Sequence, residues 1–204
     1  MKEAIVQTVL KAYNEKLVAG TSGNVSTYDR ERELMAITPS GLDYFIMRPC
    51  DVVIMKLDGT IVEGNLNPSS EWRLHAEIYN GFDDANAVIH THSPRATSFS
   101  VVHETIPLIL IEMVYFLGGD VPLADFAIPG TQEVGFNAVK AMKNRNSCLL
   151  ANHGVVAFGK DLNEAFIRAV YVEDAATIYH FARQLGTPVL VPDEAAATMR
   201  DKYL

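Results

Sequence analysis

Two histidines separated by a single residue, His90 and His92, are best suited by type and spacing to bind a metal ion. They follow the apolar residues Val88 and Ile89, which are typical of a buried strand. Residues two apart on a strand point to the same face, so the two imidazoles should project side by side. Pro94 should end the strand and leave the pair at its carboxyl end, where a site can open. Such a pair taken alone is more often structural, so the metal interpretation needs further ligands.

His153 is the candidate for a third ligand. It closely follows the apolar run 149–151 and precedes Gly154, so a second predicted strand delivers an imidazole at its end. Three neutral nitrogen donors with one open position are typical of a catalytic zinc site. Cysteine ligands are not expected, because neither Cys50 nor Cys148 has a second thiol beside it.

Glu71 and the two preceding serines, Ser69 and Ser70, allow two interpretations. One is a plain helix start, in which a serine caps a helix that runs to Tyr79. In the other, the free N–H groups and hydroxyls bind phosphate, while an ionised Glu71 serves as a metal ligand or a base. His75 shares the helix face of Glu71 and is expected to be a partly buried helix histidine, with a supporting role at the site as the alternative.

Two glycine-containing loops offer further groups for an anion. Gly23 with Asn24 provides close backbone approach and a short amide, and Ser40 with Gly41 provides a hydroxyl and a permissive backbone. Each motif alone is more typical of an ordinary turn. The sequence contains no Walker A loop and no Gly-x-Gly-x-x-Gly motif.

The elements that must position these residues alternate along the chain. Helices are predicted at 2–19, from Ser69 or Ser70 to Tyr79, at 94–102 and 131–143, and from Asp161 or Asn163 to Leu185; strands are predicted at 34–38, 52–56, 60–63, 87–91, 147–151 and 155–158. Residues 21–26 are predicted to form a loop, and 106–117 is ambiguous between strand and helix. The interleaving predicts an α/β fold with a sheet covered by helices, and the hairpin-length connections favour a mixed or largely antiparallel sheet.

Bulk properties narrow the class of protein. The 204 residues suit one domain, and a formal net charge of -8 at pH 7 argues against a nucleic-acid or anionic-membrane partner. The apolar run 106–117 is too short to span a bilayer, and the charged, amphipathic N-terminus does not resemble a signal peptide. Two cysteines without a Cys-x-x-Cys motif favour a reducing compartment, so a cytoplasmic location is expected.

Taken together, the motifs resemble those of the class II aldolase/epimerase family, in the family's order from about residue 2 to residue 190. Within the family, the chain is most similar to the branch that cleaves ketose 1-phosphates such as L-fuculose 1-phosphate. The motifs that carry the resemblance are Gly23-Asn24-Val25-Ser26, Thr38-Pro39-Ser40-Gly41, Pro68-Ser69-Ser70-Glu71-Trp72-Arg73, His90-Thr91-His92, Gly130-Thr131 and Asn152-His153-Gly154.

The resemblance implies a single class II aldolase-like domain over 1–204, with three layers in the order α/β/α. It also implies a homotetramer with active sites at subunit interfaces and one Zn²⁺ per subunit. The positions matching the zinc ligands are His90, His92, His153 and Glu71, and Glu71 also matches the catalytic acid/base. The positions matching the phosphate-binding residues are Gly23, Asn24, Ser40, Gly41, Ser69 and Ser70.

The implied reaction is that of a lyase acting on a small-molecule sugar phosphate. Cleavage of a ketose 1-phosphate between C3 and C4 leaves a metal-stabilised enediolate, and the products are dihydroxyacetone phosphate and an aldehyde. Glu71 would protonate C3 in cleavage and remove that proton in condensation.

The chain departs from the family's pattern at the aldehyde end of the site. The family's tyrosine from a neighbouring subunit is matched by position to Glu112, while Tyr115 lies three residues later, and the sequence leaves open which of them substitutes. A partly desolvated Glu112 carboxyl would suit a proton donor, whereas an interface ion pair is the structural alternative. Tyr203 is a loose match to a tyrosine in the family's C-terminal tail.

Three other functions fit parts of the pattern. An L-ribulose-5-phosphate 4-epimerase-like enzyme shares the metal chemistry, but that branch carries aspartate where this chain has Glu71. A methylthioribulose-phosphate dehydratase-like enzyme is a second alternative. A metal-free aldolase-like interaction module is the alternative outside enzymology, and the presence of all three histidines with Glu71 speaks against it.

Overall fold

The computed structural model describes residues 1–203 and is organised around one eight-stranded sheet in the order β4-β3-β2-β1-β5-β8-β7-β6. Neighbouring strands are antiparallel except β6 and β7, which are parallel, so the expected mixed, largely antiparallel sheet is confirmed. The strands are β1 Asn24–Asp29, β2 Leu34–Ile37, β3 Val53–Met55, β4 Ile61–Glu63, β5 Ala87–Thr91, β6 Leu123–Ala124, β7 Ser147–Leu150 and β8 Gly154–Gly159.

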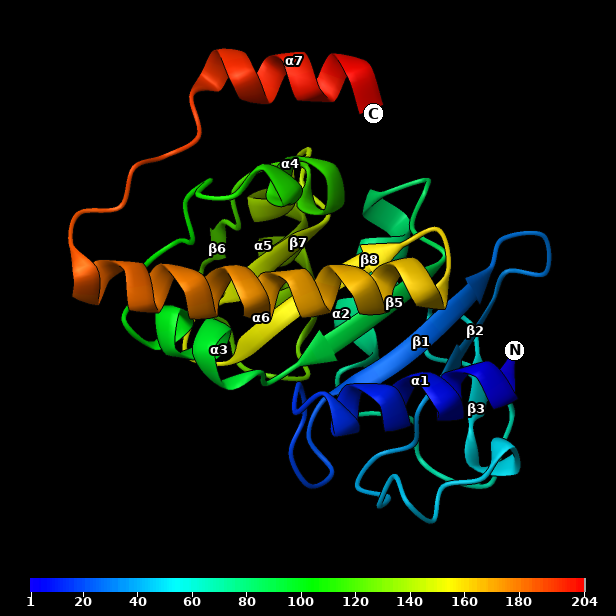
Figure 1. Cartoon of the computed structure of the whole chain (residues 1–204). Helices are drawn as coiled ribbons and strands as arrows, with labels where there is room; N and C mark the ends of the chain where they lie inside the picture. Colours follow the sequence, from blue (N-terminus) through cyan, green and yellow to red (C-terminus); the bar gives the residue numbers. More distant parts are fainter. Residues whose placement is uncertain (204) are drawn as a thin grey trace.

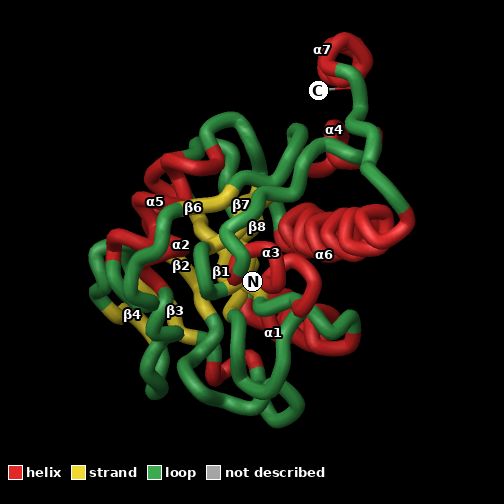
Figure 2. Tube along the Cα trace, turned by 90° about the vertical axis from the view of Figure 1, so that its left-hand side faces the viewer, coloured by secondary structure: helices red, strands yellow, loops and turns green. Residues whose placement is uncertain are grey.

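Helices cover both faces of the sheet. They are α1 Lys2–Asn14, α2 Trp72–Gly81, α3 Pro94–Val101, α4 Ile111–Leu117, α5 Gln132–Met142, α6 Leu162–Leu185 and α7 Asp193–Tyr203, with a short 3₁₀ turn at Pro49–Asp51. Figure 2 shows α2 and α5 on one side of the strands and α1, α3 and α6 on the other. The predicted α/β/α layering is therefore confirmed.

Strand β5 shows how the sequence produces these layers. Val88 packs into the core beneath α2 and α5, while Ala87 and Ile89 pack into the core beneath α1 and α6. All three are at most 1% exposed. Because successive side chains of a strand point to opposite faces, a strand covered on both faces must be apolar throughout.

Helix α1 ends at Asn14, five residues earlier than predicted. Lys16 has a left-handed φ of 60°, and the Leu17 N–H donates to the Ala12 carbonyl (2.9 Å) in a C-terminal turn. Leu17 is still buried, which explains why its spacing looked helical. The Leu17 carbonyl accepts the N–H of His92 (3.1 Å), so the turn supports the end of β5.

The prediction that residues 21–26 form a loop was wrong, because β1 begins at Asn24. Asn24 pairs with His90 of β5, and Ser26 pairs with both Ile37 of β2 and Val88 of β5. The strand is interior to the sheet, yet its buried residues include polar side chains that are unusual in a core.

The ambiguous run 106–117 contains both kinds of structure. Ile106 forms an antiparallel bridge with Val121, and α4 begins only at Ile111.

The chain after α6 forms α7, which the sequence analysis did not predict, and α7 lies beyond α4, outside the layers (Figure 1). Among the described residues, no helix is both long and apolar enough to cross a membrane.

Candidate active site and metal centre

Four predicted ligands lie close together where strand β5 ends and strand β8 begins; they are His90, His92, His153 and Glu71. Their potential ligand atoms all lie within 4.8 Å of one another. His90 Nε2 is 2.9 Å from His92 Nε2 and 3.0 Å from Glu71 Oε2, and His153 Nε2 is 3.2 Å from Glu71 Oε1. The three histidines and the glutamate therefore form the shared centre that the sequence analysis required.

The sheet delivers the histidines from two adjacent strands. His90 lies opposite Val156 in the β5–β8 pairing, and its Nδ1 faces the Val155 carbonyl at 2.8 Å. A carbonyl only accepts, so Nδ1 carries the proton and Nε2 presents its lone pair to the centre. His153 lies in the turn between β7 and β8, immediately before β8, and His92 lies one residue beyond the end of β5.

Gly154 is required by the close packing of the imidazoles. A Cβ at this position would collide with the Thr91 carbonyl and would lie 3.0 Å from His92 Cδ2 and 3.3 Å from His90 Cε1. The absence of a side chain at Gly154, next to His153, therefore makes room for the other two histidines.

Glu71 is the N-cap residue of α2, which begins at Trp72; the expectation that Ser69 or Ser70 caps the helix was therefore incorrect. Ser69 forms a tight turn before the helix, in which its Oγ accepts the Glu71 N–H (3.3 Å) and its carbonyl accepts the Trp72 N–H (3.1 Å). The cap position leaves the Glu71 side chain directed at the histidines, where Asn24 Nδ2 donates to its Oε2 (3.2 Å).

The charge states of the cluster suit metal binding. Burial lowers the pKa of His92 and of His153 to about 4, so both imidazoles are neutral near pH 7. Burial acts to raise the pKa of Glu71, but the neighbouring His90 and His153 imidazoles and the Asn24 amide outweigh it and hold that pKa below its usual range. Neutral imidazole and ionised carboxylate are the forms that coordinate metals.

The geometry also fits a bound divalent ion. A tetrahedral ion with bonds of about 2.0–2.1 Å keeps its ligand atoms roughly 3.3 Å apart, close to the 2.9, 3.0 and 3.2 Å separations found here. Glu71 Oε1 is buried and has no hydrogen-bond partner among the described residues, which is costly for a carboxylate unless a cation neutralises it. The positions and charge states of these residues therefore fit a metal site of three histidines and one glutamate.

The segments predicted to bind phosphate lie side by side next to this centre. The Thr38 N–H donates to the Val25 carbonyl, and the Ser69 N–H donates to the Thr38 carbonyl, each at 3.0 Å. The Ser40 N–H donates to the Asn67 carbonyl at 2.9 Å. Backbone hydrogen bonds therefore join the three segments that contain Gly23 with Asn24, Ser40 with Gly41, and Ser69 with Ser70.

The individual residues of these segments differ in accessibility. Ser40, Gly41 and Ser70 are exposed and Ser69 is buried. Asn24 is 3% exposed, and both ends of its amide contact protein groups, Glu71 and His75. A phosphate role for the six residues stays a prediction, and Asn24 has a contact with Glu71 that the sequence did not indicate.

Tyr115 lies far from this centre within one chain. It lines a hollow of about 430 Å³ with residues at the start of α6, including Asp161. That helix follows Gly159, at the opposite end of β8 from Gly154 and His153. Five strand steps of about 3.3 Å separate the two ends by roughly 17 Å.

Glu112 lies on the same short helix, α4, as Tyr115. It is exposed, so the desolvation expected from its apolar neighbours is absent in the single chain. In Figure 1, α4 lies above α6 and the carboxyl end of β5 lies below it. One chain therefore does not bring α4 to its own metal centre. The side chain of Tyr203, the loose match in the tail, lies outside the described part of the structure.

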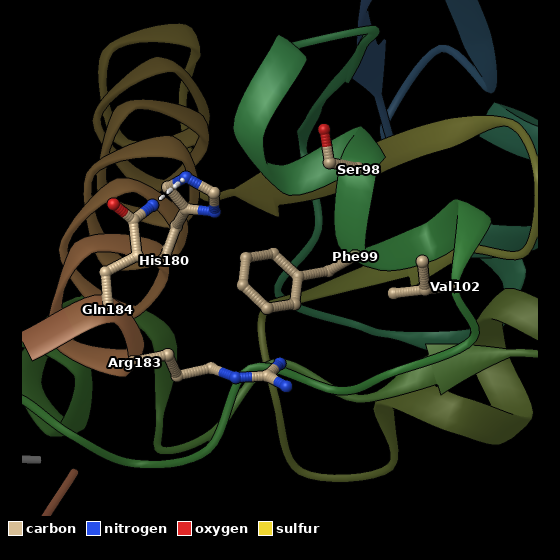
Figure 3. Close-up of a pocket in the computed structure, with 6 residues that line it drawn as sticks. All are labelled: Ser98, Phe99, Val102, His180, Arg183 and Gln184. Carbon is tan, nitrogen blue, oxygen red and sulfur yellow. Dashed lines mark hydrogen bonds between the residues drawn. The ribbon is translucent and has the colours of Figure 1, made fainter. Parts of the chain in front are cut away.

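The remaining histidines are placed outside the metal centre. His103 Nε2 contacts Asn152 Oδ1 at 2.6 Å, and His180 accepts a hydrogen bond from Gln184 (2.7 Å). His180 lines a separate hollow of about 320 Å³ between α3 and α6 (Figure 3), which shares no lining residue with the metal centre. His75 is fully buried rather than partly buried, and its contacts connect it to the site.

Comparison with known proteins agrees with this fold and shows the family. The family model described as Class II Aldolase and Adducin N-terminal domain matches residues 3–180. The chain is 37% identical over 202 residues to 5-deoxy-D-ribulose 1-phosphate aldolase of Bacillus thuringiensis serovar kurstaki, covering 99% of this chain and 94% of the relative. It is 36% identical over 200 residues to L-fuculose phosphate aldolase of Escherichia coli strain K12, covering 98% and 92%. A solved structure of an L-fuculose 1-phosphate aldolase has a TM-score of 0.95 and 42% sequence identity, covering 99% of this chain and 95% of that chain.

A three-layer α/β fold with a three-histidine, one-glutamate centre at its sheet edge defines the class of protein as a class II aldolase. The match over most of the chain shows that this protein belongs to the class II aldolase and adducin N-terminal domain family. Its relatives are aldolases, and the protein is accordingly a lyase.

Proposed function

We propose that this protein is a zinc-dependent aldolase that cleaves a ketose 1-phosphate to dihydroxyacetone phosphate and an aldehyde. The observation that carries the proposal is the convergence of His90, His92, His153 and Glu71 within 4.8 Å, beside three hydrogen-bonded segments that carry the exposed hydroxyls of Ser40 and Ser70. Three imidazoles and a carboxylate favour zinc among the common divalent ions.

A bound zinc ion supplies Lewis acidity, which stabilises negative charge that develops on the substrate during C–C cleavage. The three histidines hold the ion in their neutral form, and the hydrogen bond of His90 to the Val155 carbonyl fixes which ring nitrogen is offered. The three histidines therefore contribute by holding the ion in place and by presenting an unprotonated ring nitrogen to it.

Glu71 is the residue proposed to move the proton at C3. Its carboxyl is 7% exposed and ionised, so it can accept a proton from C3 in condensation and return it in cleavage. Its buried Oε1, which has no hydrogen-bond partner, is the oxygen better suited to this exchange.

The proposed phosphate contacts come from Gly23, Asn24, Ser40, Gly41, Ser69 and Ser70. Exposed hydroxyls and backbone N–H groups of these loops would orient the phosphate, which fixes the position of C3 relative to Glu71. Gly23 has φ +75°, and a Cβ there would lie 2.7 Å from the His90 carbonyl, so a side chain at this position would disturb both the loop and the ligand.

We also propose a homotetramer in which α4 of one subunit completes the site of its neighbour. Glu112 and Tyr115 lie on α4, away from the metal centre of their own chain. A cytoplasmic location fits the two free cysteines, Cys50 and Cys148.

The test offers zinc-loaded protein a panel of ketose 1-phosphates and measures release of dihydroxyacetone phosphate. L-Fuculose 1-phosphate and 5-deoxy-D-ribulose 1-phosphate head the panel, because related proteins are named for them. Release from at least one of them is expected, and addition of a chelator should stop it. Conversion of L-ribulose 5-phosphate to its C4 epimer without triose release would contradict the proposal, and so would metal-loaded protein that cleaves no member of the panel.

A further inference from the structure

We propose that His75 is a positioning residue for Glu71, acting through a buried hydrogen-bond chain that runs from Tyr79 through Ser26, His75 and Asn24 to the carboxylate. The inference rests on the catalytic role proposed for Glu71. His75 forms no hydrogen bond with the four proposed metal ligands, and its effect would be exerted through its contact with Asn24, whose amide nitrogen donates to Glu71.

The chain of contacts is continuous. Tyr79 OH lies 2.6 Å from Ser26 Oγ, and Ser26 Oγ lies 2.6 Å from His75 Nδ1. His75 Nε2 contacts Asn24 Oδ1, and Asn24 Nδ2 donates to Glu71 Oε2 at 3.2 Å. All five side chains are buried, with exposures of 0% for Ser26 and His75, 1% for Tyr79, 3% for Asn24 and 7% for Glu71.

Two elements create the chain by their periodicities. Glu71, His75 and Tyr79 are spaced by four residues and share one face of α2 and its cap. Asn24 and Ser26 are two residues apart and share one face of β1. The polar side chains of this helix face therefore alternate with those of the strand face along the hydrogen-bond chain.

Only one direction of hydrogen bonding satisfies every member. An ionised carboxylate accepts but does not donate, so the amide nitrogen of Asn24 must face Glu71 and its oxygen must face His75. The Asn24 oxygen needs a donor, so His75 carries its proton on Nε2 and accepts from Ser26 at Nδ1. Ser26 then accepts from Tyr79. Every donor in the chain points toward Glu71.

The buried environment keeps His75 in this single form. Burial lowers the pKa of His75 to about 3, so near pH 7 the ring is neutral, with one donor and one acceptor nitrogen. The ring thereby fixes the Asn24 amide, and the amide holds Glu71 Oε2. Within the described part of the protein Glu71 Oε1 has no hydrogen-bond partner, so the hydrogen-bond chain distinguishes the two oxygens of the carboxylate.

Three variants separate positioning from general packing. His75→Phe keeps a ring but removes both hydrogen bonds, and kcat is expected to fall roughly 10- to 100-fold, the usual effect of losing a group that orients a ligand. KM and zinc content should stay near wild type. His75→Gln restores an N–H donor for Asn24 and should recover most of the lost kcat.

Ile78→Ala is the matched control, because Ile78 is fully buried on the same helix and forms no part of the chain. It should lower the melting temperature but leave kcat at 25 °C unchanged. If kcat falls in proportion to lost stability in all three variants, or if His75→Phe has wild-type kcat, the positioning role is refuted.

Neutron diffraction of the deuterated wild-type protein tests the direction of the chain without any variant or assay. Deuterium is expected on His75 Nε2 and absent from Nδ1, with the Ser26 hydroxyl directed at Nδ1. Deuterium on Nδ1 would overturn the proposal. Failure of the wild-type protein to cleave any ketose phosphate would instead reject the proposed function and leave this measurement valid.

Discussion

The metal centre and helix α4 both carry candidate catalytic groups, but the two regions are built differently. His90, His92, His153 and Glu71 occupy the ends of interior strands and the cap of α2, and they are buried or half-buried. Glu112 and Tyr115 lie on the seven-residue helix α4 at the periphery, and both are exposed.

This contrast shows which side chains a single subunit can position by itself. Ligands of a single ion need placement within a few tenths of an ångström, which strands with both faces buried provide. Groups on an exposed helix are placed by whatever packs against that helix. We therefore expect changes at the metal centre to act within one subunit and changes on α4 to act across subunits.

The largest effect is expected from His92→Ala. Removal of one imidazole should abolish zinc retention, and cleavage should fall at least about a thousandfold with the loss of Lewis-acid stabilisation. Metal analysis and the triose-release assay check this. His180→Ala, which changes a histidine outside the centre, should retain metal and activity, and wild-type turnover by zinc-free His92→Ala would contradict the assignment.

Glu71→Gln is expected to have the next largest effect. The amide can still occupy the space of the carboxylate, so zinc should be retained, but it cannot accept a proton. Exchange of the C3 proton of dihydroxyacetone phosphate in heavy water, followed by NMR, should slow about 10²- to 10⁴-fold. Glu77→Gln, farther along α2, is the matched control. Unimpaired exchange in Glu71→Gln would remove this residue from its proposed role.

A smaller effect is expected on α4, where Glu112→Gln and Tyr115→Phe are compared. One of the two should lower kcat by about a hundredfold, the lower range for loss of a general acid, while the other stays near wild type. The substitution that lowers kcat would identify the residue that acts at the aldehyde oxygen.

Subunit mixing tests directly whether α4 of one subunit acts at the metal centre of another. Glu71→Gln protein mixed with the impaired α4 variant should regain activity after subunit exchange, because some interfaces then pair an intact Glu71 with an intact α4. Absence of recovery in exchanged oligomers would mean that the site is complete within one chain.

The smallest effect is expected from Gly154→Ala, which leaves every ligand in place. Its Cβ would press on the Thr91 carbonyl and on the His92 ring, so zinc affinity should fall about tenfold by misalignment. Competition with a chelator measures this change. Gly186→Ala is the control, since a Cβ there meets nothing within 4 Å. Equal affinities in the two variants would show that the histidines tolerate displacement.

Local sequence pattern determined much of this protein. The two-residue period of a strand put His90 and His92 on one side, and the apolar run before His153 predicted a second strand end. The helix predicted at 131–143 matches α5 to within one residue at each end, and the strands predicted at 52–56 and 60–63 correspond to the antiparallel pair β3 and β4. These features depend on neighbours in the chain, so the residues alone specify them.

Tertiary structure decided the rest, because the deciding contacts join residues distant in sequence. Asn24 and Ser26 made β1 look like a loop, and only their hydrogen bonds to Glu71, His75 and Tyr79, about 50 residues away, make burial of those polar groups favourable. Leu17 has helical spacing, but it lies beyond the left-handed turn at Lys16, where its carbonyl accepts the His92 N–H. Spacing along a chain records which face a side chain occupies, whereas the partner it meets there depends on how the elements pack.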